Sequence, residues 1–198
     1  MENNYQYLDP EEKYTNSKGV LHNLANIKDE RVLVAFESFK VTKRLEELYA
    51  LTFKIKDSSA LLYLHKHLFQ DVYDWAGQVR TVNISKDGKP FFDGELFPNA
   101  FKFIDSLIIE YYHIDKNKVK EISQKLAEIL DTINFLHPFR EGNGRTQREF
   151  LRILALEKGF QLNLNPPDNK DTYYRYMKGT IESNVTILQE LIFELISL

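Results

Sequence analysis

The sequence predicts an all-α protein, a single-domain helical bundle that carries one small β-hairpin. Apolar side chains recur every three or four residues through most of the 198 residues, which is the spacing of amphipathic helices. Apolar and polar residues alternate, as in a strand, between residues 81 and 92. With 43% hydrophobic residues and no obvious linker, the chain is long enough to bury one good core, so one domain is expected.

The first 28 residues differ in composition from the rest of the chain. They are polar and rich in turn-forming residues, among them Pro10 and Gly19. We therefore predict an N-terminal arm at residues 1–28, which lies over a domain formed by residues 29–198.

Two helices are predicted between this arm and the hairpin. The second begins at Ser58 or Ser59, either of which can cap it, and ends near Gln70. The first begins at Asp29, and the apolar residues that we expect to face the core recur along it: Val32, Phe36, Phe39, Leu45, Leu48 and Tyr49.

Two histidines of the second helix, His65 and His67, invite interpretation as a metal site. They stand two residues apart, so on a helix they point to different faces. We expect His65, which lies on the apolar face, to be a hydrogen-bonded core residue, and His67 to lie at the surface.

The alternating stretch at residues 81–92 turns at Asp87 and Gly88, a strong signal for a two-residue hairpin. An isolated hairpin is only marginally stable in water, so this one is predicted to be mobile unless something pairs with it. Its open edge can accept an extended peptide through backbone hydrogen bonds.

Five more helices are predicted after the hairpin. Pro138 disfavours a helical conformation for the residue before it, so the central and most buried of these helices must stop at about His137. The histidine is thereby set at a helix end. The five helices are expected at residues 97–113, from Asp115 or Asn117 to about 137, and at residues 144–158, 172–183 and 185–198.

Residues 137–148, His-Pro-Phe-Arg-Glu-Gly-Asn-Gly-Arg-Thr-Gln-Arg, predict a site for phosphate groups. Gly142 and Gly144 let backbone N–H groups approach a ligand closely, and the residues after them are strong helix formers. The unpaired N–H groups and the dipole of a helix N-terminus favour an anion. Arg145 and Arg148 lie three residues apart on this helix and can add donors to the same phosphates.

Two further residues of this stretch are candidates for a metal ligand and a catalytic base. Glu141 is a candidate magnesium ligand, because Mg²⁺ on a phosphate group is usually held by one or two protein carboxylates. His137 is the one group in the stretch that can act as a base near neutral pH. A merely structural glycine loop between two helices would not need this set of side chains.

The pattern His-Pro-Phe-x-Glu-Gly-Asn-Gly-Arg-x-x-Arg resembles the signature of the Fic domain family at every fixed position. A second segment, from Trp75 to Arg80, resembles the Trp-Ala-Gly-x-x-Arg segment that precedes the active-site flap in Fic proteins. The resemblance implies a helical bundle of the Fic type. For most members it also implies transfer of AMP from ATP to a hydroxyl group of a target protein.

The resemblance assigns the chemistry of this reaction to two residues. His137 would take the proton from a Tyr, Thr or Ser hydroxyl of the target, and Glu141 would hold Mg²⁺ against the α- and β-phosphates. ATP is then the substrate and Mg²⁺ the cofactor. The protein supplies position, a proton acceptor and countercharge, as in other phosphoryl-type transfers.

The resemblance assigns the phosphates to the residues that follow. The N–H groups around Gly142, Asn143 and Gly144, with the Asn143 amide, would form an anion hole, and Arg145 and Arg148 would grip the β- and γ-phosphates. A relative that transfers phosphate has a lysine at the position of Gly144. Glycine at that position keeps room for the α-phosphate and so favours AMP transfer.

In Fic proteins the flap holds the target segment beside the catalytic histidine. The resemblance carries this role onto five residues of the predicted hairpin: Asn83, Ile84, Ser85, Lys86 and Phe91. Tyr173 and Tyr176 are candidate adenine contacts, although aromatic residues at such spacing usually just pack.

Many Fic proteins carry or borrow an inhibitory helix with the pattern Ser/Thr-x-x-x-Glu-Gly/Asn, whose glutamate pairs with the arginine that corresponds to Arg148. This pattern does not occur in the sequence, and the stretch from Thr186 to Leu191 comes closest. An unrestrained AMP-transferring enzyme would be toxic. We therefore predict that the protein is the toxin of a toxin–antitoxin pair, with a small antitoxin that supplies the helix.

Composition excludes several other classes. The net charge is −3 and the pI about 6.0, without a basic stripe, so nucleic acid is a poor partner. There is no cysteine, which excludes disulfides and thiol chemistry. No signal peptide or membrane-spanning stretch is recognisable, so we expect a cytoplasmic protein without a membrane partner.

Several alternatives remain open at this stage. The same scaffold could transfer another phosphate-containing group or remove AMP. The chain could also be a nucleotide-binding regulatory module without catalysis, which would predict damage to His137 or Glu141, and both are intact. A plain helical interaction domain would leave the arginines and glycines unexplained.

Overall fold

The computed structural model describes residues 5–7, 12–86, 89–164 and 169–197. Within these residues seven α-helices dominate, which confirms the all-α prediction, and three short strands form one small sheet. In chain order the elements are β1 (Tyr5–Tyr7), α1 (Glu30–Ala50), α2 (Ser59–Phe69), β2 (Ile84–Lys86), β3 (Lys89–Pro90), a 3₁₀ helix (Gly94–Leu96), α3 (Phe97–His113), α4 (Val119–Leu136), α5 (Asn143–Glu157), α6 (Lys170–Glu182) and α7 (Val185–Leu195).

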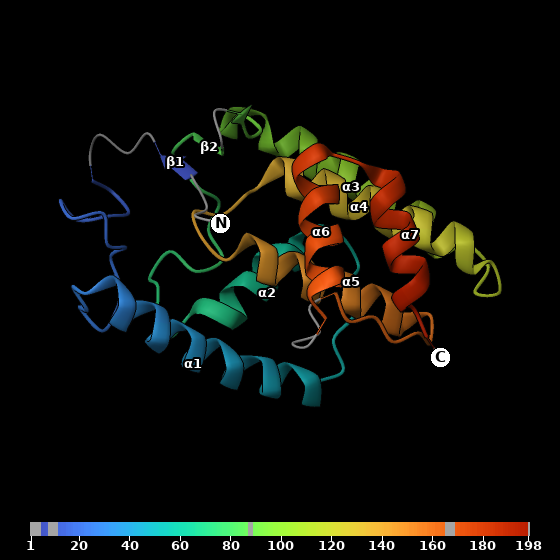
Figure 1. Cartoon of the computed structure of the whole chain (residues 1–198), viewed down its shortest axis with the longest axis horizontal. Helices are drawn as coiled ribbons and strands as arrows, with labels where there is room; N and C mark the ends of the chain where they lie inside the picture. Colours follow the sequence, from blue (N-terminus) through green and yellow to red (C-terminus); the bar gives the residue numbers. More distant parts are fainter. Residues whose placement is uncertain (1–4, 8–11, 87–88, 165–168, 198) are drawn as a thin grey trace.

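Helix α4 is the centre of the bundle, as predicted. It packs against α3, α5, α6 and α7. In Figure 1, α3, α4, α6 and α7 gather on one side of the molecule, α1 and α2 lie on the other side, and α5 runs between the two groups. Because α5 contacts both α2 and α4, its N-terminus stands where the two groups meet. The fully buried apolar residues of α4 are Ile122, Leu126, Ala127, Ile129 and Leu130.

A second, smaller apolar cluster joins α1 and α2 to the segment before α1. The Tyr14 ring lies edge-on to Trp75, with the ring centroids 5.7 Å apart. Residues of the predicted arm therefore contribute to a core, while the division into an arm and a domain stays a prediction. The cluster includes Tyr14, Val20, Leu33, Val41, Phe69, Tyr73 and Trp75.

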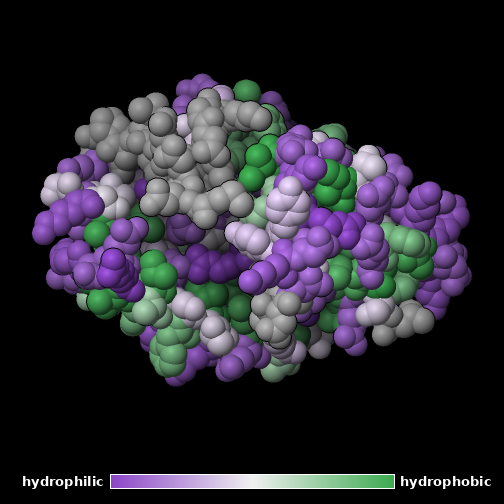
Figure 2. Space-filling view, in the orientation of Figure 1, coloured by the Kyte–Doolittle hydropathy of each residue, from purple (hydrophilic) through white to green (hydrophobic). Residues whose placement is uncertain are grey.

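The predicted core face of α1 is only partly right: Leu48 is buried, and Phe36 and Leu45 pack partly buried against the second cluster. Val32, Phe39 and Tyr49 were expected to be buried, but they are 54%, 56% and 58% exposed. Figure 2 shows apolar side chains at the surface over α1, mixed with hydrophilic ones. The prediction was wrong for these three residues because apolar residues cover more than one face of α1, so their spacing does not say which of them point inward. The buried residues are Leu33, Glu37, Val41 and Leu48.

The sheet has the strand order β1-β2-β3, and both pairs are antiparallel. Strands β2 and β3 form the predicted hairpin, whose turn at Asp87 and Gly88 lies outside the described residues. The hairpin is not isolated, because β1 pairs with the other edge of β2 and places Gln6 opposite Ser85. The N-terminal segment thus occupies the edge of β2 that the sequence predicts to be open to a peptide.

The helix ends follow local capping, with some differences from the prediction. Asp29 caps α1, since its Oδ1 accepts the N–H of Val32 at 3.1 Å. Helix α4 begins later than predicted, because Asp115 uses its side chain in a turn, accepting the N–H of Asn117 at 2.8 Å. His67, expected at the surface, is half-buried. No helix in the described ranges has both the length and the apolar character needed to span a membrane.

Candidate active site

His137 lies at the end of α4, as the sequence predicts. Its N–H donates to the carbonyl of Ile133 at 3.0 Å, and its backbone is left-handed, with φ 44°. Residues other than glycine rarely adopt this conformation. Pro138 follows and prevents the helix from continuing. The imidazole is therefore set at a sharp corner of the backbone, where the residue is only 8% exposed.

A hydrogen bond fixes the tautomer of His137. Its Nδ1 lies 3.2 Å from the carbonyl oxygen of Asn134. A carbonyl can only accept, so Nδ1 carries the proton and donates it. The neutral ring then has its lone pair on Nε2. This is the arrangement that a general base requires.

Arg80 fixes the same corner from a distant segment, and only the family resemblance pointed to it. Its Nε donates to the carbonyl of His137 at 2.8 Å, and its backbone N–H donates to the carbonyl of Pro138 at 2.8 Å. Its Nη1 and Nη2 donate to the carbonyls of Val82 (2.8 Å) and Phe92 (2.5 Å) at the base of the hairpin. This buried cation also complements the dipole at the end of α4.

Helix α5 begins with three N–H groups that have no partner among the residues that the structure describes. Its first hydrogen bond runs from the N–H of Thr146 to the carbonyl of Gly142, at 3.1 Å. Among the described residues, none accepts from the backbone N–H groups of Asn143, Gly144 or Arg145. These three donors lie at the positive end of the helix dipole, a geometry that suits an anion.

The loop before α5 is braced from inside. The Oδ1 of Asn143 accepts the N–H of Phe139 at 2.9 Å, and its Nδ2 donates to the carbonyl of the same residue at 2.7 Å. The Asn143 amide, expected to contact phosphate, is thus used inside the loop, and its backbone N–H is what faces an anion. Gly142 is left-handed, with φ 81°, and a Cβ there would lie 2.4 Å from the ring of Phe69, so only glycine fits.

His65 of α2 is a further brace, and it is the hydrogen-bonded core residue that was predicted. Its ring stacks on Phe139, with the centroids 3.8 Å apart. Its Nδ1 accepts the N–H of Gly77 at 2.8 Å, so its Nε2 carries the proton and donates to the carbonyl of Glu141 at 3.0 Å. Burial lowers the pKa of His65 to about 3, so the ring stays neutral at neutral pH.

Arg145 joins two carboxylates. Its Nη1 lies 2.6 Å from Oε1 of Glu37, and its Nη2 lies 3.5 Å from Oε1 of Glu141. The guanidinium also stands over the ring of Phe69, 4.7 Å from the centroid. The Tyr73 hydroxyl donates to the other oxygen of Glu37, and burial, with the charge of Glu37, raises the pKa of this hydroxyl. Arg145 still has N–H donors for a phosphate, because a guanidinium has five.

Glu141 has the features of a magnesium ligand that shares the ion with phosphates. Its side chain is 41% exposed, and Oε1 accepts the N–H of Gly142 at 2.9 Å. In the part of the chain that the structure describes, no three His, Cys, Asp or Glu side chains are grouped to bind a metal by themselves. Mg²⁺ keeps several water molecules and often takes one or two carboxylates plus substrate phosphates. The donors present therefore fit Mg²⁺.

Arg148 lies beside Gly144 and over Tyr176. A Cβ at Gly144 would lie 3.2 Å from Nη1 of Arg148, and the guanidinium stands 5.6 Å from the centroid of the Tyr176 ring. Tyr176, predicted as an adenine contact, is only 4% exposed and donates its hydroxyl to Gln147 at 3.2 Å. It supports Arg148 and does not offer an open ring face. Tyr173 is 53% exposed, and its role stays a prediction.

The hairpin contacts His137 through Phe91. The Phe91 ring stacks on the ring of His137, with the centroids 4.0 Å apart. The N–H of Phe91 donates to the carbonyl of Ile84 at 3.0 Å, and Ile84 is buried in the fold. The structure thus brings one of the five predicted flap residues against His137 and turns another inward. The other three lie on β2 or next to it: Asn83, Ser85 and Lys86.

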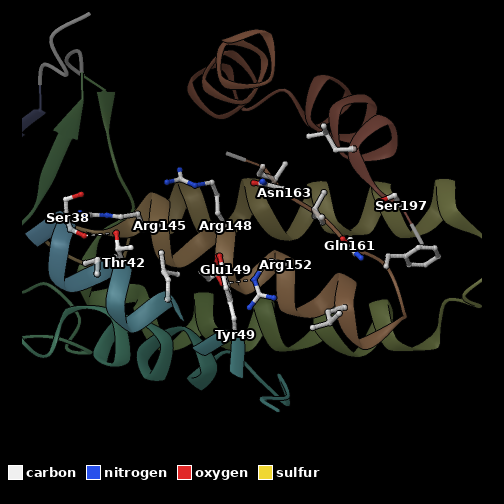
Figure 3. Close-up of a pocket in the computed structure, with 17 residues that line it drawn as sticks. Ser38, Thr42, Tyr49, Arg145, Arg148, Glu149, Arg152, Gln161, Asn163 and Ser197 are labelled. Atoms are coloured by element: carbon white, nitrogen blue, oxygen red, sulfur yellow. Dashed lines mark hydrogen bonds and ion pairs between the residues drawn. The ribbon is translucent and has the colours of Figure 1, made fainter. Parts of the chain in front are cut away.

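A cavity of about 690 Å³ opens beside the motif, between α1, α5 and the segment that follows α5 (Figure 3). Arg145 and Arg148 line it from α5. Arg152 lines it as well and pairs with Glu149 at 2.7 Å. His137 is not part of the lining, so the cavity lies on the arginine side of the site and not at the base.

Two named proteins are similar in sequence. VbhT of Bartonella schoenbuchensis, named a protein adenylyltransferase, is 37% identical over 161 residues, which cover 81% of this chain and 32% of VbhT. The protein y4lH of Sinorhizobium fredii, named a probable protein adenylyltransferase, is 36% identical over 166 residues, which cover 82% of this chain and 85% of y4lH. The chain thus spans less than half of VbhT but most of y4lH.

The fold and the family model agree with this similarity. The crystal structure of BepC from Bartonella tribocorum, with bound AMPPNP, matches with a TM-score of 0.80 over 94% of this chain and 97% of that one; the identity is 21%, so this likeness shows the fold alone. The model of the Fic/DOC family matches residues 55–155, which contain α2, the hairpin and the motif. Since this match covers half of the chain and y4lH is 36% identical over most of its length, the chain belongs to the Fic/DOC family.

Proposed function

We propose that this protein is a protein adenylyltransferase, which moves AMP from ATP to a Tyr, Thr or Ser hydroxyl of a target protein. One observation carries the proposal: His137, with its lone pair on Nε2, stands at one end of a braced loop. The other end of this loop carries three N–H groups that none of the described residues accepts. A base and an anion site are therefore joined by a few fixed residues. The names of VbhT and y4lH support the same activity.

In this reaction the target hydroxyl attacks the α-phosphorus of ATP. His137 accepts the hydroxyl proton at Nε2, the new O–P bond forms, and the bond from the α-phosphorus to the bridging oxygen breaks, so that pyrophosphate leaves with the electron pair. The N–H groups of Asn143, Gly144 and Arg145, with the guanidinium groups of Arg145 and Arg148, supply countercharge. Catalysis then comes from positioning and electrostatics.

Glu141 would hold the magnesium ion that accompanies ATP. When bound, Mg²⁺ supplies charge neutralisation for the phosphates. The chain presents the Glu141 carboxylate, one oxygen of which is fixed by the N–H of Gly142 at 2.9 Å. Gly144 supports transfer of AMP, because even a Cβ at that position would lie 3.2 Å from Nη1 of Arg148 and crowd the nucleotide site.

Target docking at the hairpin is part of the proposal, through Asn83, Ile84, Ser85, Lys86 and Phe91. The stacking of Phe91 on His137 supports it, because this contact joins the hairpin to the base. Since β1 occupies one edge of β2, an extended target segment has to replace β1 or pair with the sheet at β3.

For the adenine of ATP, the proposed contact is Tyr173, whose side chain is exposed.

The proposal includes regulation by a separate antitoxin in the cytoplasm. The inhibitory pattern does not occur in the sequence, and no carboxylate of the described residues forms an ion pair with Arg148. A helix of a small partner protein that carries a glutamate could enter the cavity of about 690 Å³ and pair with Arg148. We also propose that residues 1–28 act as an arm on a Fic domain formed by residues 29–198.

One experiment separates AMP transfer from the alternatives. The protein is incubated with Mg²⁺, a cell lysate and ATP labelled on either the α- or the γ-phosphate, and is compared with His137→Ala. We expect label from the α-phosphate on a protein, lost in the variant by about 10²- to 10⁴-fold in rate. Label only from the γ-phosphate would mean phosphate transfer. Binding of ATP without either label would mean a regulatory module.

A further inference from the structure

Glu37 is a buried charge that the periodicity of α1 did not predict. It lies in the middle of α1, and its side chain is 10% exposed. One oxygen pairs with Arg145, and the other accepts the hydroxyl hydrogen of Tyr73. Burying a carboxylate is costly unless it is both paired and hydrogen-bonded, and here both conditions are met. Glu37 is therefore committed to the first arginine of the motif.

The two carboxylates that Arg145 contacts are not equivalent. The N–O distance is 2.6 Å to Glu37 and 3.5 Å to Glu141. The side chain of Glu37 is 10% exposed and that of Glu141 is 41% exposed, so solvent screens the pair with Glu37 less. Both distance and burial make Glu37 the main partner, while the contact with Glu141 lies at the limit of a hydrogen bond.

We propose that Glu37 is a positioning residue, which holds Arg145 back from Glu141 and thereby keeps the Glu141 carboxylate available to the magnesium ion of Mg-ATP. This inference rests on the proposed function. Without the charge of Glu37, the only carboxylate left to Arg145 of these two is Glu141, and the guanidinium moves closer to it. The guanidinium then competes with Mg²⁺ for the same oxygens. Glu37 acts through Arg145 and not by contact with the nucleotide.

The same ion pair could instead serve only to hold α1 against α5. A second contact between these two helices separates the possibilities. The hydroxyl of Tyr49 donates to Oε1 of Glu149 at 3.3 Å, and the guanidinium of Arg152 lies 4.4 Å from the centroid of the Tyr49 ring. Tyr49→Phe weakens the attachment of α1 to α5 without touching Arg145 or Glu141, so it is a matched control.

The test is binding of AMPPNP, measured by isothermal titration calorimetry over a series of Mg²⁺ concentrations. Wild type is compared with Glu37→Gln, which keeps the shape of the side chain and removes its charge, and with Tyr49→Phe. For Glu37→Gln we expect the Mg²⁺ concentration of half-maximal effect to rise about 10- to 100-fold, the range for changes to residues that support a metal ligand. For Tyr49→Phe we expect no change in this concentration.

A Mg²⁺ dependence of Glu37→Gln equal to wild type overturns the proposal, and so does an equal rise in Tyr49→Phe. If circular dichroism shows that Glu37→Gln is unfolded, Glu37→Asp replaces it. That variant keeps the buried charge but withdraws it by one methylene, and an unchanged Mg²⁺ dependence again overturns the proposal. Failure of the wild type to bind AMPPNP with Mg²⁺ would remove the proposed function itself, and the wild-type titration alone detects that case.

Discussion

The loop before α5 and the hairpin both lie next to His137, but different interactions hold them in place. The loop is fixed by hydrogen bonds to three buried residues, His65, Arg80 and Asn143, which lie apart in the sequence. The hairpin has strands of three and two residues and is flanked by a third strand of three residues. It contacts His137 through Phe91. Sheets this small contribute little stability of their own.

Under the proposed function, the loop holds the base and the anion site, and the hairpin docks the target, so the two regions have different tasks. A base and an anion site must be held within a fraction of an ångström, which buried and fully paired supports achieve. Recognition of an extended segment needs backbone groups that can exchange partners, and such groups belong to regions of low local stability. We therefore expect changes in the loop to lower global stability, and changes in the hairpin to affect local opening and target binding.

The largest expected effect in the loop is that of Gly142→Ala. The new Cβ would lie 2.4 Å from the Phe69 ring at φ 81°. Overpacking and left-handed strain together should lower the free energy of unfolding by roughly 2–5 kcal/mol, measured by urea denaturation. Gly159→Ala is the matched control, since Gly159 has φ 86° but no atom within 4 Å of its added Cβ. Equal losses in both variants would show that contact with Phe69 does not fix the loop.

The second effect is a pH dependence that His65 gives to stability. Its pKa falls from 6.5 to about 3 on folding, so between these values the unfolded chain binds the extra proton. This contribution is complete above pH 6.5 and decreases as the pH falls, by about 1.4 kcal/mol per unit. The difference in unfolding free energy between wild type and His65→Gln, followed from pH 7 to pH 4.5, should show it. If the unfolding free energies of the two proteins change in parallel with pH, the lowered pKa of His65 is contradicted.

In the hairpin, the larger effect should come from Phe91→Ala. Loss of an aromatic pair costs about 1 kcal/mol beyond burial, which corresponds to about a fivefold change in an equilibrium constant. We expect the KM for the target protein to rise by about that factor, while AMPPNP binding and the urea midpoint stay close to wild type. The KM, the AMPPNP affinity and the urea midpoint of Phe91→Ala are compared with those of Ile84→Ala, which truncates a buried residue of the same hairpin. A loss of AMPPNP affinity in Phe91→Ala would place the ring in the nucleotide site.

The smallest effect should be that of Gln6→Pro, which tests the pairing of β1 with β2. The N–H of Phe91 donates to the carbonyl of Ile84, so the backbone groups of Ile84 face β3. Successive residues of a strand face opposite neighbours, so those of Ser85 face Gln6. Proline removes the N–H of residue 6 and with it one hydrogen bond to Ser85, worth about 1 kcal/mol. The pairing of β1 with β2 should then open about five times as often, so exchange of the Ser85 amide hydrogen should become about fivefold faster. Gln6→Ala, which keeps the backbone N–H, is the control. If the Ser85 amide exchanges no faster in Gln6→Pro than in Gln6→Ala, the pairing with β1 does not protect Ser85.

Features with a local signal were predictable from the sequence. Pro138 stops α4 at the histidine, and Gly142 and Gly144 mark the loop. The burial of Glu37 was not predictable, because α1 has apolar residues on more than one face and only tertiary contacts decide which face is inward. The pairing of β1 with β2 joins segments far apart in the chain, and such pairing leaves no mark in either segment.

The left-handed backbone of His137 has a consequence for how this protein can change. At φ 44° a glycine or an asparagine would lie with less strain than a histidine. Selection for heat resistance and selection for chemistry therefore favour different residues at this position. A library of variants screened only for survival at high temperature is expected to replace His137 before it replaces His65 or Arg80. Under the proposed function, the resulting proteins fold but lack the catalytic base.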